Sequence, residues 1–231
     1  MPAVIINPDF AEALVPPLVS YGFDILVLPR CCSVHPALSG HADISLAQIG
    51  NTVVVRPDMP ACFVSELSSR TTVVHGETLL AETYPADVAY NIAPAPGCYF
   101  HRTDLTDPVV ASVCAARRLE AVDVRQGYSG CSVITLPDGS IITSDTPIAR
   151  RAEEKGIDVL RVSPAGIDLP GFSHGLIGGS AGCYGSTLYI TGDLSHHEDA
   201  ERIFGFTGAR GIRISRLTPK PVFDVGTLFF V

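Results

Sequence analysis

The chain alternates between short apolar runs rich in β-forming residues and longer stretches with helix-like spacing. In five places an apolar run is followed within a few residues by Asp and then by a helical stretch. These pairs are Val4–Ile6 with Asp9, Val53–Val55 with Asp58, Tyr99–Phe100 with Asp104, Ile141–Ile142 with Asp145, and Leu188–Ile190 with Asp193. The five Asp residues are 49, 46, 41 and 48 positions apart. Self-similarity of this kind predicts five copies of a unit of about 45 residues.

Each unit is expected to contain a helix and a second strand. The expected helices are Phe10–Ser20, Pro60–Ser68, Pro108–Leu119, Pro147–Lys155 and His197–Phe204. We expect each Asp to cap its helix, because a carboxylate accepts hydrogen bonds from exposed backbone N–H groups there. The pair Pro16 and Pro17 is expected to break or bend the first helix. The second strands are expected at Asp24–Leu28, Thr72–Val74, Ala121–Val124, Val159–Val162 and Ile212–Ile214.

A second series of markers lies in the loop before the strand that closes each unit. Its members are Asp43, Asp87, Cys131, Gly178 and Asp224, at spacings of 44, 44, 47 and 46. Two independent series therefore give the same period.

The repeat predicts an α/β fold in which the units close into a ring. One such unit cannot bury its own apolar faces, so neighbouring copies must pack together. The five units fill residues 1–231, which predicts a single domain. The apolar end Thr227–Val231 is expected to pair near the first strand, Ala3–Asn7.

Composition restricts the classes of partner. Of the 231 residues 46% are hydrophobic and only 17% are charged, which predicts a large core. The formal net charge of -8 provides no basic surface for nucleic acid or for anionic lipid, and favours a small cationic molecule as partner. We find no basic leader and no apolar run near the ~18 residues that span a bilayer, so a soluble, cytoplasmic protein is expected. Nothing in the sequence defines an oligomeric state.

The sequence predicts no metal site and no cofactor. Its seven cysteines show no Cys-x-x-Cys spacing, so we interpret them as reduced thiols. The stretch Ser195–Glu198 has metal-ligand residue types, but Ser followed three positions later by Glu indicates first a capping box. The stretch Gly175–Gly182 fits neither the dinucleotide-binding nor the P-loop pattern.

Three segments resemble the pentein, or guanidino-group modifying, superfamily. Gly40–Val55 resembles the strand with His and Asp of agmatine and arginine deiminases, and Gly127–Asp145 resembles a strand and hairpin of the same enzymes. Gly171–Asp193 resembles their Gly-rich strands. The resemblance covers the whole chain and implies a five-fold pseudosymmetric α/β propeller. Those enzymes carry a nucleophilic Cys near the C-terminus, whereas this chain has no Cys after Cys183, which suggests a distinct branch.

In a ring of this kind, equivalent loops converge on a central funnel, so the second series supplies the candidate site. For substrate binding we expect Asp43, Asp87, Asp224, Gly178, Gly179 and, at the rim, Tyr128. Carboxylates accept parallel N–H bonds from a planar guanidinium, and Gly allows close approach. For catalysis we expect Cys131 as nucleophile, with His41 or His174 protonating the departing amine. The hypothesis is a hydrolase or transferase of amidino or guanidino groups, in particular a hydrolase of linear amidines.

Other interpretations of the same residues remain open. The repeated Asp residues can bind backbone as Asx turns do, and His174 can be an ordinary loop histidine. Cys131 can be a packed thiol, with Ser132 or Cys183 facing the funnel instead. The alternative function is a non-catalytic binding or assembly protein, like the ribosome anti-association factors that share the pentein fold.

Overall fold

The computed structural model describes residues 1–231, and its strands form five separate three-stranded sheets. In each sheet the middle strand is antiparallel to one neighbour and parallel to the other. The sheets are β15 (Phe229–Phe230), β1 (Ala3–Ile6) and β2 (Asp24–Val27); β3 (Leu46–Ile49), β4 (Thr52–Val55) and β5 (Thr72–His75); β6 (Ala93–Ala95), β7 (Cys98–His101) and β8 (Glu120–Asp123); β9 (Val133–Thr135), β10 (Ile141–Thr143) and β11 (Val159–Arg161); and β12 (Ala181–Tyr184), β13 (Thr187–Ile190) and β14 (Arg213–Arg216). All residues of the five middle strands are buried, which is why their sequences are mostly apolar.

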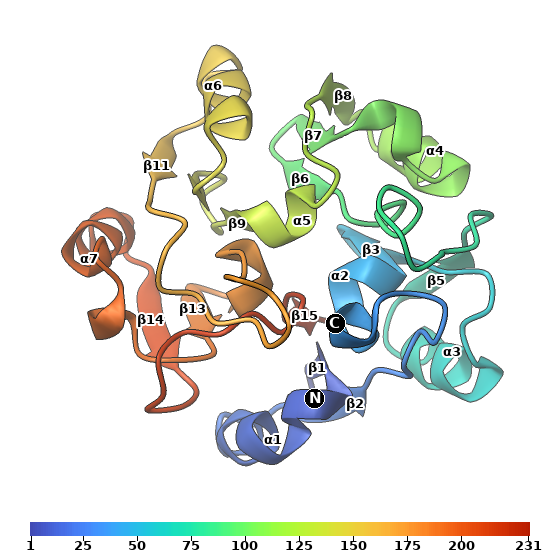
Figure 1. Ribbon diagram of the computed structural model, residues 1–231, viewed down its shortest axis with the longest axis horizontal. Helices are drawn as coiled ribbons and strands as arrows, with labels where there is room; N and C mark the ends of the chain where they lie inside the picture. The colour runs from blue at the N-terminus through green and yellow to red at the C-terminus, as the bar shows by residue number, and fades with distance from the viewer.

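A helix connects each middle strand to its parallel neighbour. These helices are α1 (Ala11–Ser20), α3 (Ala61–Ser68), α4 (Pro108–Ala116), α6 (Thr146–Glu154) and α7 (Ala200–Gly208). Figure 1 shows them on the outside, with the sheets arranged around a common centre. The short helices α2 (Ala42–Ser45) and α5 (Ser129–Ser132) lie near that centre, and the 3₁₀ turns are η1 (Pro8–Phe10), η2 (Pro36–Leu38), η3 (Thr103–Leu105), η4 (Gly178–Ser180) and η5 (Leu194–His196). The predicted order of strand, helix, strand and closing strand is confirmed in all five units.

Of the break or bend expected at Pro16 and Pro17, the break is wrong. Helix α1 continues through both prolines to Ser20. Proline removes the hydrogen bond to the carbonyl four residues earlier, here those of Glu12 and Ala13. These two residues are accessible to water, which can replace the missing donors, while Leu14 and Leu18 bury the opposite face and hold the helix. Tertiary packing therefore outweighs the local preference.

The predicted helix cap is correct at one of the five Asp residues. Asp145 accepts a hydrogen bond from the Ile148 N–H at 2.8 Å at the start of α6. Asp193 accepts one from the Ser195 N–H at 2.9 Å, but it caps the 3₁₀ turn η5 and not the expected helix, and the predicted capping box that begins at Ser195 is therefore wrong. The other three Asp residues form ion pairs instead: Asp9 with Arg30, Asp104 with Arg102, and Asp58 with the buried Arg56.

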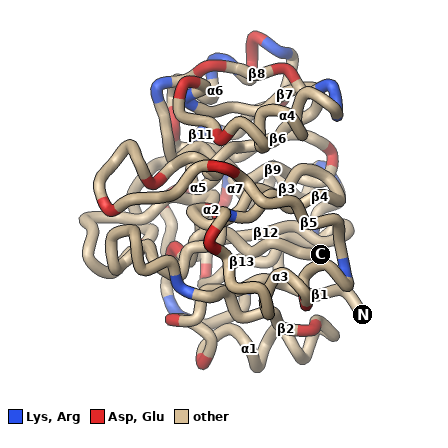
Figure 2. Tube along the Cα trace, turned by 90° about the vertical axis from the view of Figure 1, so that its right-hand side faces the viewer, with Lys and Arg blue, Asp and Glu red and all other residues tan.

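The two ends of the chain share the first sheet. Strand β15 pairs antiparallel with β1, with Val4 opposite Phe230, and the backbones of Ala3 and Val231 exchange two hydrogen bonds of 2.8 Å. Figures 1 and 2 both show the N- and C-terminus close together. The expected pairing of the C-terminal segment with the first strand is confirmed.

Charged residues lie mainly along the outer helices and loops of the chain trace (Figure 2). Five charged side chains are instead buried, namely Asp43, Arg56, Asp87, Asp107 and Asp224. Because a buried carboxylate costs free energy unless it has partners, the three that belong to the second sequence series mark a place where the core is polar. No helix is both long and apolar enough to cross a membrane.

The aromatic side chain that joins the ends of the chain is Phe230. It is 8% exposed, and its ring centroid lies 4.9 Å from that of Phe23 and 5.3 Å from that of Tyr189. We expect Phe230→Ala to lower the free energy of unfolding by about 3 kcal/mol, because truncation leaves a cavity in a packed aromatic cluster. Urea unfolding followed by circular dichroism measures this change. Phe204→Ala, on the exposed side of α7, is the control and should change stability by less than about 1 kcal/mol.

Candidate active site

Five of the predicted site residues line one cavity of about 320 Å³. We call it the site cavity. Its lining residues are Leu38, His41, Gln126, Tyr128, Cys131, Leu169, Phe172, Ser173, His174, Leu176 and Asp224. They come from segments that precede the inner strands of different sheets, so the convergence of equivalent loops is observed for this set.

Two four-residue helices deliver the central side chains. His41 stands at the N-cap of α2, and Cys131 lies within α5; each helix ends directly in an inner strand, β3 or β9. The turn of helix reverses the chain at the centre of the molecule, which directs these side chains inward. Ser132, the neighbouring alternative, bonds instead to the Tyr128 carbonyl oxygen at 2.7 Å and does not line the cavity.

The Cys131 thiol is held by polar side chains. Its Sγ donates to Asp43 Oδ2 at 3.1 Å and accepts from Asn91 Nδ2 at 3.1 Å, and its backbone N–H donates to Asn91 Oδ1 at 3.1 Å. The thiol is almost fully buried, although it forms part of the cavity wall. Burial, together with the nearby carboxylates of Asp43 and Asp224, raises the pKa of the Cys131 thiol well above its usual value. The raised pKa makes Cys131 a neutral thiol at pH 7.

The Asp43 carboxylate connects this thiol to the C-terminal segment. Its Oδ2 also accepts a hydrogen bond from Thr227 Oγ1 at 2.7 Å, and its backbone N–H donates to the Gly226 carbonyl oxygen at 3.1 Å. The other oxygen, Oδ1, is buried without a hydrogen-bond partner. Burial raises the pKa of Asp43, so this carboxyl group holds a proton more readily than a surface Asp does.

His41 and Asp224 form the second polar pair of the cavity. His41 Nδ1 lies 3.8 Å from Asp224 Oδ1, and neither ring nitrogen of His41 has a hydrogen-bond partner although the side chain is buried. Asp224 is held by the N–H groups of Leu176 and Gly226, each at 2.9 Å. Buried polar atoms without partners are uncommon and costly. Such atoms at the wall of a cavity are placed to bond to a ligand or to water.

Glycines let these groups approach one another. Gly226 has a φ of 77°, and a Cβ there would collide with the His41 side chain. A Cβ on Gly179 would collide with the Asp224 carboxylate, and one on Gly178 would collide with the backbone of Cys131. Gly178 and Gly179 therefore make room for other site residues of the protein, and they do not line the site cavity.

Asp87 lies behind the cavity wall. Its Oδ2 accepts a hydrogen bond from the Tyr128 hydroxyl at 2.6 Å, and Asp87 itself does not line the cavity. Burial raises the pKa of Asp87. Tyr128 is covered on its outer side by Tyr84, with ring centroids 5.6 Å apart. Asp87 therefore positions Tyr128 at the rim.

His174 lies on the exposed side of the site cavity. Its Nδ1 is 3.1 Å from the carbonyl oxygen of Gly175, and no contact joins it to Cys131 or Asp43. Of the two predicted histidines, His41 is the one placed beside a buried carboxylate.

Sequence reasoning missed Asn91 and Thr227. Asn91-Ile92 precedes strand β6 much as Asp43-Ile44 precedes β3. The spacing of 44 residues from Asp43 led instead to Asp87. Thr227 has a φ of 66°, which is rare for a β-branched residue and cannot be read from its sequence context.

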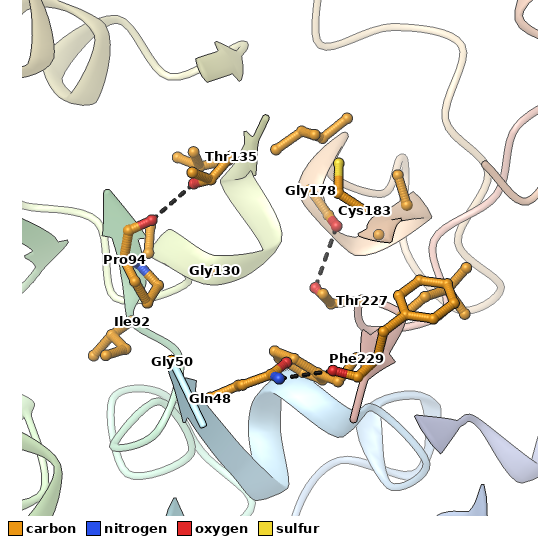
Figure 3. A pocket seen from close by; sticks show the side chains of 17 residues that line it. Gln48, Gly50, Ile92, Pro94, Gly130, Thr135, Gly178, Cys183, Thr227 and Phe229 are labelled. Carbon is orange, nitrogen blue, oxygen red and sulfur yellow. Dashed lines mark hydrogen bonds between the residues drawn. The ribbon is translucent and has the colours of Figure 1, made fainter. Parts of the chain in front are cut away.

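A separate cavity of about 290 Å³ lies between the inner strands (Figure 3). We call it the strand cavity. It includes Thr227, Gly178 and Cys183, and shares no lining residue with the site cavity. Cys183 therefore lines a different cavity from Cys131. Burial raises the pKa of the Cys183 thiol to about 12. Asp43 lies between the two cavities, because it contacts Cys131 of one and Thr227 of the other.

A family model matches residues 5–229, which is almost the entire chain. The chain belongs to the Family of unknown function (DUF6873). No curated protein sequence matches this DUF6873 chain.

Solved structures with the same fold are variants of dimethylarginine dimethylaminohydrolase. One is a His-to-Gly variant as an adduct with S-methyl-L-thiocitrulline, with a TM-score of 0.57 and 9% identity over 93% of this chain and 91% of that one. Another is a Cys-to-Ser variant of the Pseudomonas aeruginosa enzyme in complex with citrulline, with a TM-score of 0.54 and 8% identity over the same shares. The DUF6873 chain therefore has the mixed α/β pentein fold that the sequence resemblance implied.

The contact between Asp43 and Cys131 predicts how the thiol titrates. Asp43→Asn removes a negative charge from beside the thiol, so the pKa of Cys131 falls and more thiolate is present at a given pH. We expect iodoacetamide to label Cys131 about tenfold faster at pH 9 in this variant, as mass spectrometry of the modified peptide would measure. Asp87→Asn is the matched control, since Asp87 has no contact with Cys131. Equal labelling rates for wild type and Asp43→Asn would contradict the assignment.

Proposed function

We propose that this protein is an amidino- or guanidino-group hydrolase or transferase that acts on a small cation through Cys131. The observation that carries the proposal is the Cys131 thiol hydrogen-bonded to buried Asp43, in a cavity that also holds the partnerless ring of His41 beside Asp224. The pentein fold shared with dimethylarginine dimethylaminohydrolase supports the same class of reaction.

The charge of the cavity favours a cationic ligand. Asp224 is the only carboxylate of the wall, and Asp43 lies directly behind Cys131. A planar amidinium or guanidinium in the cavity can donate N–H bonds to Asp224, while Asp43 attracts it by charge from behind Cys131. The free-energy cost of removing the cation from water is then offset by its attraction to two negative groups that are themselves poorly solvated.

Binding of the cation also activates the thiol. Burial and the negative charges of Asp43 and Asp224 raise the pKa of Cys131. A bound cation neutralises those charges and lowers the pKa of the thiol. The thiol proton then passes to Asp43 along the existing 3.1 Å hydrogen bond. Thiolate is formed only when substrate is present, which keeps the free protein unreactive.

The reaction follows in two halves. The Cys131 thiolate adds to the central carbon, the carbon–nitrogen bond breaks, and protonated His41 gives its proton to the departing ammonia or amine. Water, deprotonated by the now neutral His41, then attacks the S-linked amidino carbon and the carbon–sulfur bond breaks. Cys131 recovers its proton from Asp43, and the product is a urea from a guanidine or an amide from an amidine. In a transferase an amine takes the place of water.

One observation favours a second candidate, a binding protein without catalysis. The Cys131 side chain is only 4% exposed, and no imidazole nitrogen lies within hydrogen-bond distance of it. A thiol so enclosed can serve as a packed polar group that fixes Asp43, with the cavity used to bind a cation and release it unchanged.

For the fold, we infer a single domain of residues 1–231 arranged as a closed five-fold α/β propeller. The five sheets around one centre and the pairing of β15 with β1 support this arrangement.

Replacement of the thiol separates the two candidates. We expect Cys131→Ser to reduce the release of ammonia or amine from a panel of guanidines and amidines by at least about a thousandfold, while cation binding persists. Cys183→Ser is the control, because Cys183 lines the strand cavity, and it should retain activity. Turnover that survives in Cys131→Ser would refute the thiol mechanism, and binding without turnover in the wild type would favour the binding protein.

A further inference from the structure

The walls of the site cavity point to one kind of substrate within the proposed class. We propose that the ligand is a monocation: an amidinium or guanidinium head attached to an apolar tail that carries neither a carboxylate nor a second amine. This inference rests on the proposed function, because it assumes that the cationic head lies against Asp224, with Asp43 behind Cys131.

The cavity contains no Lys or Arg to form an ion pair with a carboxylate. Its other polar residues, apart from His41, Cys131 and Asp224, are Gln126, Ser173 and the exposed His174. Gln126 is already engaged, because its Nε2 donates to Asp145 Oδ2 at 3.3 Å and its Oε1 accepts the Tyr128 N–H at 3.0 Å. A carboxylate placed in this space would lose its hydration without gaining an ion pair, which disfavours an amino-acid tail.

The cavity likewise offers no second carboxylate to a terminal ammonium group. Asp224 is the only acid of the wall, and it is the group beside His41 that receives the head. Asp87 is turned toward the hydroxyl of Tyr128 and is buried behind it. A dication would therefore bury its second charge without a partner.

Apolar side chains supply the remaining wall. Leu38, Tyr128, Leu169, Phe172 and Leu176 lie along it. Phe172 is 46% exposed, and its ring meets that of His35 edge-on at 5.2 Å between centroids, so a large aromatic surface stands at the mouth. An alkyl or aryl tail would cover this surface, and each CH₂ that it buries strengthens binding about fourfold.

Calorimetric titration of the wild-type protein with four probes tests the inference. The probes are n-butylguanidinium, agmatine, L-arginine and n-butylurea. We expect n-butylguanidinium to bind at least about tenfold more tightly than agmatine and L-arginine, which share its head but carry charged tails. Agmatine or L-arginine binding as tightly as n-butylguanidinium overturns the tail inference and leaves the proposed function standing.

The neutral probe isolates the proposed function itself. Binding of n-butylurea as tightly as n-butylguanidinium shows that the head is not recognised by its charge, which overturns the proposed cation site. Failure of all three cations to bind at millimolar concentration overturns both proposals together.

A gain of specificity provides the second measurement. Ser173 lines the cavity on its exposed side, so Ser173→Arg should place a guanidinium where a carboxylate tail would lie. We expect this variant to bind L-arginine about tenfold more tightly and n-butylguanidinium more weakly than the wild type. Ser68→Arg adds the same charge on exposed α3, outside the cavity, and should leave both affinities unchanged. Unchanged L-arginine affinity in Ser173→Arg counts against the assignment of the tail to this wall.

Discussion

The buried carboxylate of Asp43 is the interaction on which the centre of this protein depends. A single oxygen accepts from a thiol 88 positions away and from a hydroxyl 184 positions away, and so joins α2, α5 and the C-terminal segment. In a low-dielectric interior these bonds are strong, and each of them would be costly to leave unmade. Burial and the same carboxylate raise the pKa of the Cys131 thiol, so the group that holds the centre together also affects its reactivity.

The centre does not minimise its own free energy. Both ring nitrogens of His41 and one oxygen of Asp43 are buried without partners, and Thr227 has an unusual positive φ. Arrangements of this kind persist only where the surrounding structure enforces them, and they concentrate at functional sites. Here the surrounding structure is the set of five apolar sheets with their outer helices, which contribute most of the core.

Two cavities meet this centre from different sides and differ in chemistry. The site cavity is lined by Asp224, two histidines and mostly aliphatic and aromatic side chains, whereas no charged residue lines the strand cavity. This lining matches the proposed monocation with an apolar tail. The dimethylarginine dimethylaminohydrolase structures share the fold at 8–9% sequence identity. The residues of the candidate site therefore have to be read from this chain itself.

The sequence by itself determined the architecture and part of the site. Five apolar runs at one period defined the middle strands, because a strand covered on both faces must be apolar throughout, and the second series located Asp43, Cys131 and Asp224. Local preferences failed where packing opposed them: α1 continues through Pro16 and Pro17 because Leu14 and Leu18 are buried.

Tertiary structure alone decided which groups touch. Three contacts depend on the packing of one unit against another. Asn91, not Asp87, bonds to the Cys131 thiol, Thr227 donates to the Asp43 carboxylate, and His41 lies beside Asp224. Periodicity places residues only to within a few positions along the chain, whereas a hydrogen bond requires placement within a few tenths of an ångström. Only the packing of the five units around one centre supplies that accuracy.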